Sequence, residues 1–146
     1  MRCRRSGKVF EGGLLIYLLD TNICIYIVKK KPPTVMRRFE SLALGDAAMS
    51  LVSYGELQFG ALKSQQASQA LGVLQELQQY IPVLSMGPEV AGHYADIRHT
   101  LARQGTPIGN NDLWIAAHAR ALDMTLVSNN LREFERVAGL KLESWI

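Results

Sequence analysis

The sequence predicts an α/β fold in which helices cover both faces of a small, twisted, mainly parallel sheet. Short apolar runs of strand length alternate with longer segments of helical period along the chain. The apolar runs are unbroken, as is typical of strands that are buried on both faces. In addition, three carboxylates stand where an apolar run or a loop passes into the next helix, at Asp20, Glu56 and Asp112.

The strands are predicted from the apolar runs. The first run ends abruptly at Asp20, and the last one is expected to form an edge of the sheet. The predicted strands are Leu14–Leu19, Ala47–Val52, Ile81–Leu84, Met124–Val127 and Leu140–Trp145.

The helices are predicted from apolar spacings of three and four residues and from their start and stop signals. A lysine run and two prolines at 29–33 end the first helix, and Thr34 caps the second. Pro88 suits a first helical turn, and Gly105 ends that helix. The predicted helices are Asn22–Val28, Thr34–Leu44, one that begins at Ser53, Gln66–Tyr80, Pro88–Gln104, Asp112–Leu122 and Asn130–Val137.

Length and composition predict one globular domain at 14–146, preceded by a flexible basic extension at 1–13 that lacks any periodic pattern. The 146 residues are 48% hydrophobic and 20% charged, which excludes a disordered chain. Two cysteines argue against a disulfide scaffold and favour a reducing cytoplasm. No apolar stretch approaches the roughly 18 residues of a membrane-spanning helix, and the first apolar run is too short for a signal peptide.

The positive charge gathers near the amino terminus. The net charge is +3, and nine basic residues up to Arg38 face only two acidic ones, Glu11 and Asp20. A basic region of this kind suits a polyanionic partner. A solvated run of lysines in a loop explains 29–31 equally well.

Each acidic residue also has a structural interpretation when it is taken alone. Asp20 suits a helix N-cap, and Asp112 suits a first helical turn. Glu56 lies three residues after Ser53, so the pair matches a capping box. Asn130 and Glu133 match a second capping box, which makes Asn130 a plain N-cap.

The combination of acids favours a different interpretation. The carboxyl ends of parallel strands meet at one edge of a sheet, so the three carboxylates are expected to converge there. Converging carboxylates repel one another unless a cation lies between them. Because the sequence shows no cluster of thiols or imidazoles, it predicts a hard ion, Mg²⁺ or Mn²⁺, at this edge.

Four motifs in this order resemble the PIN-domain ribonucleases and, more narrowly, the VapC toxins of bacterial toxin–antitoxin pairs. The resemblance covers the chain from about Leu14 to Trp145. The motifs are Leu19-Asp20-Thr21-Asn22, Gly55-Glu56-Leu57, the segment 105–112 (GTPIGNND) and the segment 128–137 (SNNLREFERV).

The resemblance implies a PIN-like three-layer α/β/α sandwich and a Mg²⁺-dependent endoribonuclease, with Mn²⁺ as a possible substitute. The fourth family position is often Asp but falls on an asparagine here, which predicts one tightly held ion. The implied catalytic residues are Asp20, Glu56, Asp112 and Asn130, with Asp20 and Asp112 as metal ligands and Thr21 and Asn22 supporting them through hydrogen bonds.

The resemblance also implies partners. It predicts tRNA as the substrate, initiator tRNA among the candidates, and cleavage to a 5′-phosphate and a 3′-hydroxyl that inhibits translation and growth. A cognate VapB-type antitoxin is expected to neutralise the enzyme with an extended segment whose basic side chain approaches the acids. A homodimer in the cytoplasm is expected.

Two other classes stay open at this stage. One is a DNA nuclease with the same fold, and the other is an inactive module that binds nucleic acid or a partner. A haloacid-dehalogenase-type phosphatase is disfavoured, because it needs a second Asp where this chain has Asn22.

Overall fold

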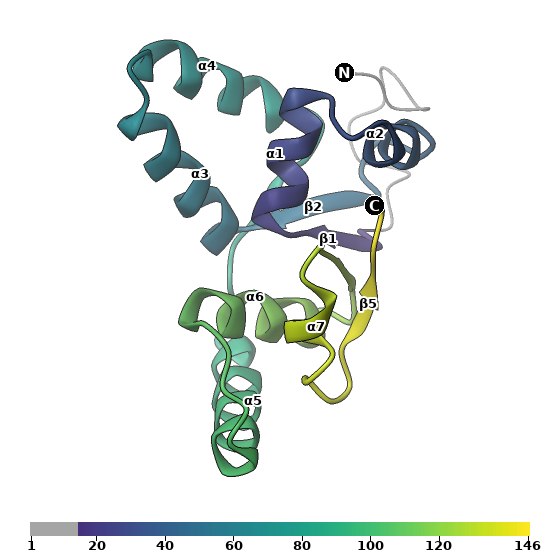
Figure 1. Ribbon diagram of the computed structural model, residues 1–146, viewed down its shortest axis with the longest axis vertical. Helices are drawn as coiled ribbons and strands as arrows, with labels where there is room; N and C mark the ends of the chain where they lie inside the picture. The colour runs from purple at the N-terminus through teal and green to yellow at the C-terminus, as the bar shows by residue number, and fades with distance from the viewer. Residues whose placement is uncertain (1–14) are drawn as a thin grey trace.

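The computed structural model describes residues 15–146 (Figure 1). The expected extension at 1–13 and the first residue of the first predicted strand lie outside the described residues. The strands are β1 (Tyr17–Leu19), β2 (Ala47–Ser50), β3 (Val83–Leu84), β4 (Thr125–Val127) and β5 (Lys141–Glu143). They form one sheet in the order β3-β2-β1-β4-β5, and every pair is parallel. The predicted edge position of the last strand is confirmed.

Seven helices connect and cover these strands in the described part of the chain. The helices are α1 (Thr21–Lys29), α2 (Pro33–Glu40), α3 (Leu51–Lys63), α4 (Ala67–Leu77), α5 (Glu89–Gln104), α6 (Asn110–Ala121) and α7 (Leu131–Phe134).

The helices form one layer on each side of the sheet. Side chains of α1 to α4 pack on one face, and those of α5 to α7 pack on the other (Figure 1). Neighbouring strand residues alternate between the two cores: Leu18 packs towards α5 and α6, whereas Leu19 packs towards α1. Each central strand is therefore buried on both faces, which explains why its sequence is an unbroken apolar run. The predicted three-layer sandwich is confirmed.

The boundary between β2 and α3 was predicted wrongly. Ser50 ends the strand, and its hydroxyl accepts a hydrogen bond from the backbone N–H of Val52 at 3.1 Å. This side chain caps α3, which begins at Leu51 and not at Ser53. The helix therefore starts two residues earlier than expected, and Glu56 lies in its second turn.

Other predicted ends were wrong because apolar spacing continues past a helix into the following turn. Leu42 and Val137 are buried, although α2 ends at Glu40 and α7 at Phe134. The first turn of α6 begins at Asn110, two residues before the prediction. By contrast, α5 ends at Gly105 as predicted, and this glycine has a positive φ of 71°.

Within residues 15–146, the structure contains no helix that is both long enough and apolar enough to span a membrane.

Candidate active site

The strand order places a topological switch point at the carboxyl ends of β1 and β4. From β1 the chain moves outward to β2 and β3, and it later returns to the other side of β1 to form β4 and β5. In parallel α/β sheets, ligands bind at such a switch point. Asp20 directly follows β1, and Ser128 directly follows β4. The Ser128 hydroxyl donates a hydrogen bond to Asp20 Oδ2 at 2.8 Å and so joins the two strand ends.

Asp20 is both a helix cap and a member of an acidic cluster. Its Oδ1 accepts a hydrogen bond from the backbone N–H of Thr21 at 2.7 Å, and the side chain is 6% exposed. Burial raises the pKa of Asp20. The hydrogen bonds from Ser128 and Thr21 oppose this rise, and the charges of Glu56 and Glu133 add to it. The capping interpretation is correct, and Asp20 also lies within reach of two other acids.

Glu56 connects three helices and does not form a capping box. Its Oε1 accepts a short hydrogen bond from Thr21 Oγ1 in α1, and its Oε2 accepts one from Asn111 Nδ2 in α6 at 3.1 Å. Ser53, its expected capping partner, is buried and its hydroxyl has no hydrogen-bond partner among the described residues. Glu56 therefore points towards the switch point from inside α3.

Asp112 lies in the first turn of α6 and has an unusually high proton affinity. Its pKa rises to about 7, mainly because of burial and then because of the neighbouring charges of Glu133 and Asp20. A hydrogen bond to Glu133 and the charge of Glu56 raise it further. Protonation of Asp112 would therefore relieve part of the repulsion in the cluster.

Glu133 is a fourth carboxylate that the sequence interpretation missed. Its Oε1 accepts a hydrogen bond from the backbone N–H of Gly109 at 3.0 Å, and its Oε2 accepts one from Asn130 Nδ2. Burial raises the pKa of Glu133, but these two bonds and one to Asp112 outweigh burial and lower it. The signal was present in the capping-box pattern at 130–133, which assigned Glu133 to a local role.

Of the two asparagines predicted near the acids, only Asn130 belongs to the hydrogen-bond network that holds the carboxylates. Asn130 precedes α7 as expected, but its side chain donates to Glu133 and does not cap the helix. Its backbone N–H donates to Ser128 Oγ at 2.9 Å, so it belongs to the network. Asn22 is exposed and its side chain forms no hydrogen bond with the described residues, so the predicted supporting bond is not formed.

The donor set of this site consists of oxygen atoms. Four carboxylates and the Asn130 amide match the ligands that Mg²⁺ and Mn²⁺ prefer. Among residues 15–146, no three His, Cys, Asp or Glu side chains are arranged to hold a metal ion as they stand. Asp20, Glu56 and Glu133 instead accept hydrogen bonds from protein donors. The chemistry of this donor set thus fits a hard ion.

The histidines lie outside this cluster, in agreement with the sequence interpretation. His118 is buried and its Nδ1 lies 2.9 Å from Ser50 Oγ. His93 accepts a hydrogen bond from Arg120 at 2.8 Å, and His99 is exposed on α5.

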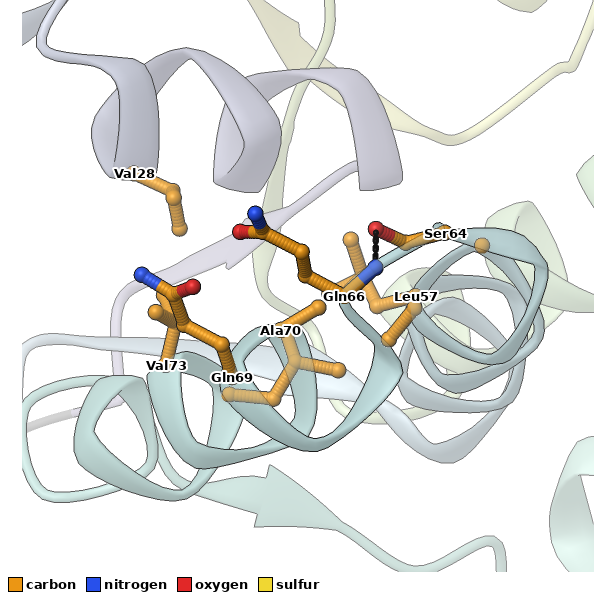
Figure 2. A pocket seen from close by; sticks show the side chains of 10 residues that line it. Val28, Leu57, Ser64, Gln66, Gln69, Ala70 and Val73 are labelled. Atoms are coloured by element: carbon orange, nitrogen blue, oxygen red, sulfur yellow. Dashed lines mark hydrogen bonds between the residues drawn. The ribbon is translucent and has the colours of Figure 1, made fainter.

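A second concave region lies between α1, α3 and α4, away from the acids. It is a groove of about 380 Å³ with an apolar floor that includes Leu57, Ala70 and Leu74. Figure 2 shows Gln66 and Gln69 reaching across it towards Val28 of α1.

The sheet order and the acids at its switch point define a class of proteins, the PIN domains. The model of the PIN domain family matches residues 17–140, and the chain belongs to this family.

Within the family, the chain belongs to the VapC ribonucleases. The tRNA(fMet)-specific endonuclease VapC of Shigella flexneri is 46% identical over 132 residues, which are 90% of this chain and 99% of that protein. Ribonuclease VapC2 of Haemophilus influenzae is 42% identical over 133 residues, or 91% of this chain and 100% of that protein. The crystal structure of VapBC2 from Rickettsia felis, bound to a DNA fragment from their promoter, is similar with a TM-score of 0.84. The matched chain is 38% identical, and the match covers 90% of this chain and 99% of that one. The resemblance predicted from the motifs is confirmed.

Proposed function

We propose that this ribonuclease hydrolyses phosphodiester bonds of tRNA, with initiator tRNA as the preferred substrate, and that it requires Mg²⁺ or Mn²⁺. The main support for this proposal is the hydrogen-bonded cluster of carboxylates from four separate chain segments at the switch point. The Shigella relative named as specific for tRNA(fMet) supports the substrate. Cleavage of this tRNA would stop translation and growth, and the enzyme would act in the cytoplasm.

The proposed metal ligands are Asp20 and Asp112, with Glu133 beside them. Glu133 supplies the negative charge that the asparagine at 130 lacks, so Asn130 acts by orienting this carboxylate through its side-chain bond. When bound, the ion would polarise a phosphate oxygen and lower the pKa of a coordinated water.

Residues of the chain itself orient the carboxylates and accept the proton of the attacking water. Ser128 and the N-terminus of α1 hold Asp20 in one rotamer. Thr21 and Asn111 hold both oxygens of Glu56, which is only partly buried and is therefore assigned to accept the proton of the attacking water. The products would carry a 5′-phosphate and a 3′-hydroxyl.

The test is incubation of the purified chain with initiator tRNA and with elongator tRNAs in Mg²⁺, in EDTA, and in Mn²⁺. Asp112→Asn should abolish cleavage while circular dichroism stays unchanged, and Glu76→Gln, an exposed carboxylate on α4, is the matched control. Cleavage in EDTA or by Asp112→Asn would contradict the proposal. Preferential cleavage of single-stranded or flap DNA would support the DNA nuclease instead, and a folded chain that binds tRNA without cutting it would support the binding module.

A VapB-type antitoxin is the proposed protein partner. The similarity to the VapBC2 structure supports this assignment. The apolar groove of Figure 2 offers space for an amphipathic segment, and Val73 at its rim is 37% exposed. A basic side chain from another part of the antitoxin would approach the acids. Val73→Glu should therefore prevent co-purification with the antitoxin and leave tRNA cleavage unchanged.

A homodimer completes the proposal. Leu51, Phe59 and Leu62 follow one stripe of α3 and are 50%, 62% and 62% exposed. A second copy of the chain would bury these side chains. Sedimentation velocity should show a dimer that Phe59→Ser converts to a monomer.

A further inference from the structure

A basic cleft adjoins the acidic cluster on its α7 side. It has a volume of about 450 Å³ and lies between the loop at 107–109 and the segment 130–136. Glu133 and Asn130 line it, so it is continuous with the site described above. The other polar side chains that line it are Arg132 and Arg136.

The two arginines have different structural roles. Arg136 donates a hydrogen bond to the carbonyl oxygen of Pro107 at 3.0 Å, and its charge helps to lower the pKa of Glu133. Arg136 therefore links the two walls of the cleft. Arg132 is exposed and forms no hydrogen bond or ion pair with another residue of 15–146. Nothing in the described fold uses its guanidinium.

An acidic site that acts on RNA needs a cation beside it. Four carboxylates repel the phosphate backbone, and only part of this repulsion is removed when a metal ion binds. Two arginines against one carboxylate give the cleft a positive balance next to that repulsive region. A guanidinium also matches a phosphate group with two parallel hydrogen bonds.

We propose that this basic cleft binds a phosphate of the RNA strand that flanks the scissile bond, with Arg132 as the contact residue and Arg136 as the positioning residue. The proposal rests on the ribonuclease function proposed above, and it adds a binding subsite to the acids.

The first test is equilibrium binding of initiator tRNA to the full chain in EDTA over a range of salt concentrations. One lost phosphate contact reduces the slope of log K against log salt by about 0.7 to 0.9, which corresponds to about five- to eightfold weaker binding at 0.1 M salt. Arg132→Ala should show this loss and Arg132→Lys less of it. Arg103→Ala, an exposed arginine on α5 that does not line the cleft, removes the same charge and should leave the slope unchanged.

The second test is single-turnover cleavage with a short RNA hairpin derived from the mapped cleavage site. A neutral methylphosphonate replaces each phosphate next to the scissile one in turn. At one position the substitution should slow the wild type about as much as Arg132→Ala does, and combining the two changes should add little. This non-additivity identifies the phosphate that Arg132 contacts.

The outcomes separate the subsite from the enzyme function. If the wild type cleaves tRNA but Arg132→Ala behaves like Arg103→Ala in both assays, the subsite is refuted and the function stands. If the wild type binds tRNA with the predicted loss in Arg132→Ala but cleaves nothing, phosphate binding by the cleft stands, whereas the proposed cleavage and the position of the phosphate beside a scissile bond are refuted. Loss of antitoxin binding without loss of RNA binding in Arg132→Ala would assign the cleft to the antitoxin and overturn the proposal.

Discussion

Replacing Asp112 by Asn should stabilise the metal-free protein while it abolishes the activity. Asparagine has the same shape and can still donate a hydrogen bond to Glu133, but it removes one negative charge from the cluster. The raised pKa of Asp112 means that its charged form is disfavoured in the folded state, chiefly by burial and by the charge of Glu133. The substitution removes this cost.

The size of the effect follows from the pKa. A rise from 3.8 to about 7 corresponds to at most about 4 kcal/mol. Because Asp112 is only partly buried, solvent screening reduces this to about 1–2 kcal/mol. A chain of this length should then melt about 3–6 °C higher in the variant.

The pH dependence provides the diagnostic sign. The folded protein binds more protons at Asp112 than the unfolded protein does between about pH 4 and pH 7, so wild-type stability falls as pH rises through this window. The free energy of unfolding of the variant should equal that of the wild type near pH 4 and should exceed it by the full amount above pH 7. Urea denaturation in EDTA at several pH values measures both curves.

Mg²⁺ should make the wild type more stable than Asp112→Asn. Saturating metal at one hundred times its dissociation constant stabilises a binding protein by about 2.7 kcal/mol, and only the wild type should show this gain. Glu76→Gln should follow the wild type under all conditions. A variant that is less stable than the wild type at pH 8 in EDTA, or a difference that is independent of pH, would refute the reasoning.

Three further changes test the surroundings of the acids. Ser128→Ala removes a 2.8 Å hydrogen bond to the buried carboxylate of Asp20 and should lower the free energy of unfolding in urea by about 1.5–3 kcal/mol. The control Ser144→Ala should lower it by under about 0.5 kcal/mol, and equal losses in the two variants would contradict this assignment. Thr21→Val removes the hydrogen bond to one oxygen of Glu56 on α3 and should lower kcat about 10- to 100-fold with little change in KM. An unchanged kcat would show that Thr21 does not position Glu56. Burial lowers the pKa of His118, so the unfolded state binds its proton first and stability should fall as pH drops below about 6.5. The expected slope of the free energy of unfolding against pH is at most about 1.4 kcal/mol per pH unit. When His118→Gln is added to Asp112→Asn, this slope should disappear. A slope that persists would show that His118 is not its cause.

Local patterns predicted most of the elements because they depend on nearby residues. The apolar run that ends at Leu19 indicated a buried strand, but the strand covers only Tyr17–Leu19, and Leu15 and Ile16 are exposed. Gly105 marked the end of α5. The helix starts at 51 and 110 were missed because a short polar side chain near a boundary has several possible roles. Ser50 and Ser53 are equally good caps in the sequence, and only the packing of β2 decides between them.

The sequence alone determined the family, the alternation of strands and helices, and the presence of Asp20 and Asp112 at helix starts after the sheet edge. It could do so because these features repeat at fixed local spacing. The tertiary structure decided which side chains meet. Glu133 faces Asp112 and Glu56 reaches Thr21 because β4 pairs with β1 and α3 crosses the same edge. Such contacts join residues that are 21 or more positions apart, and no local period encodes that neighbourhood.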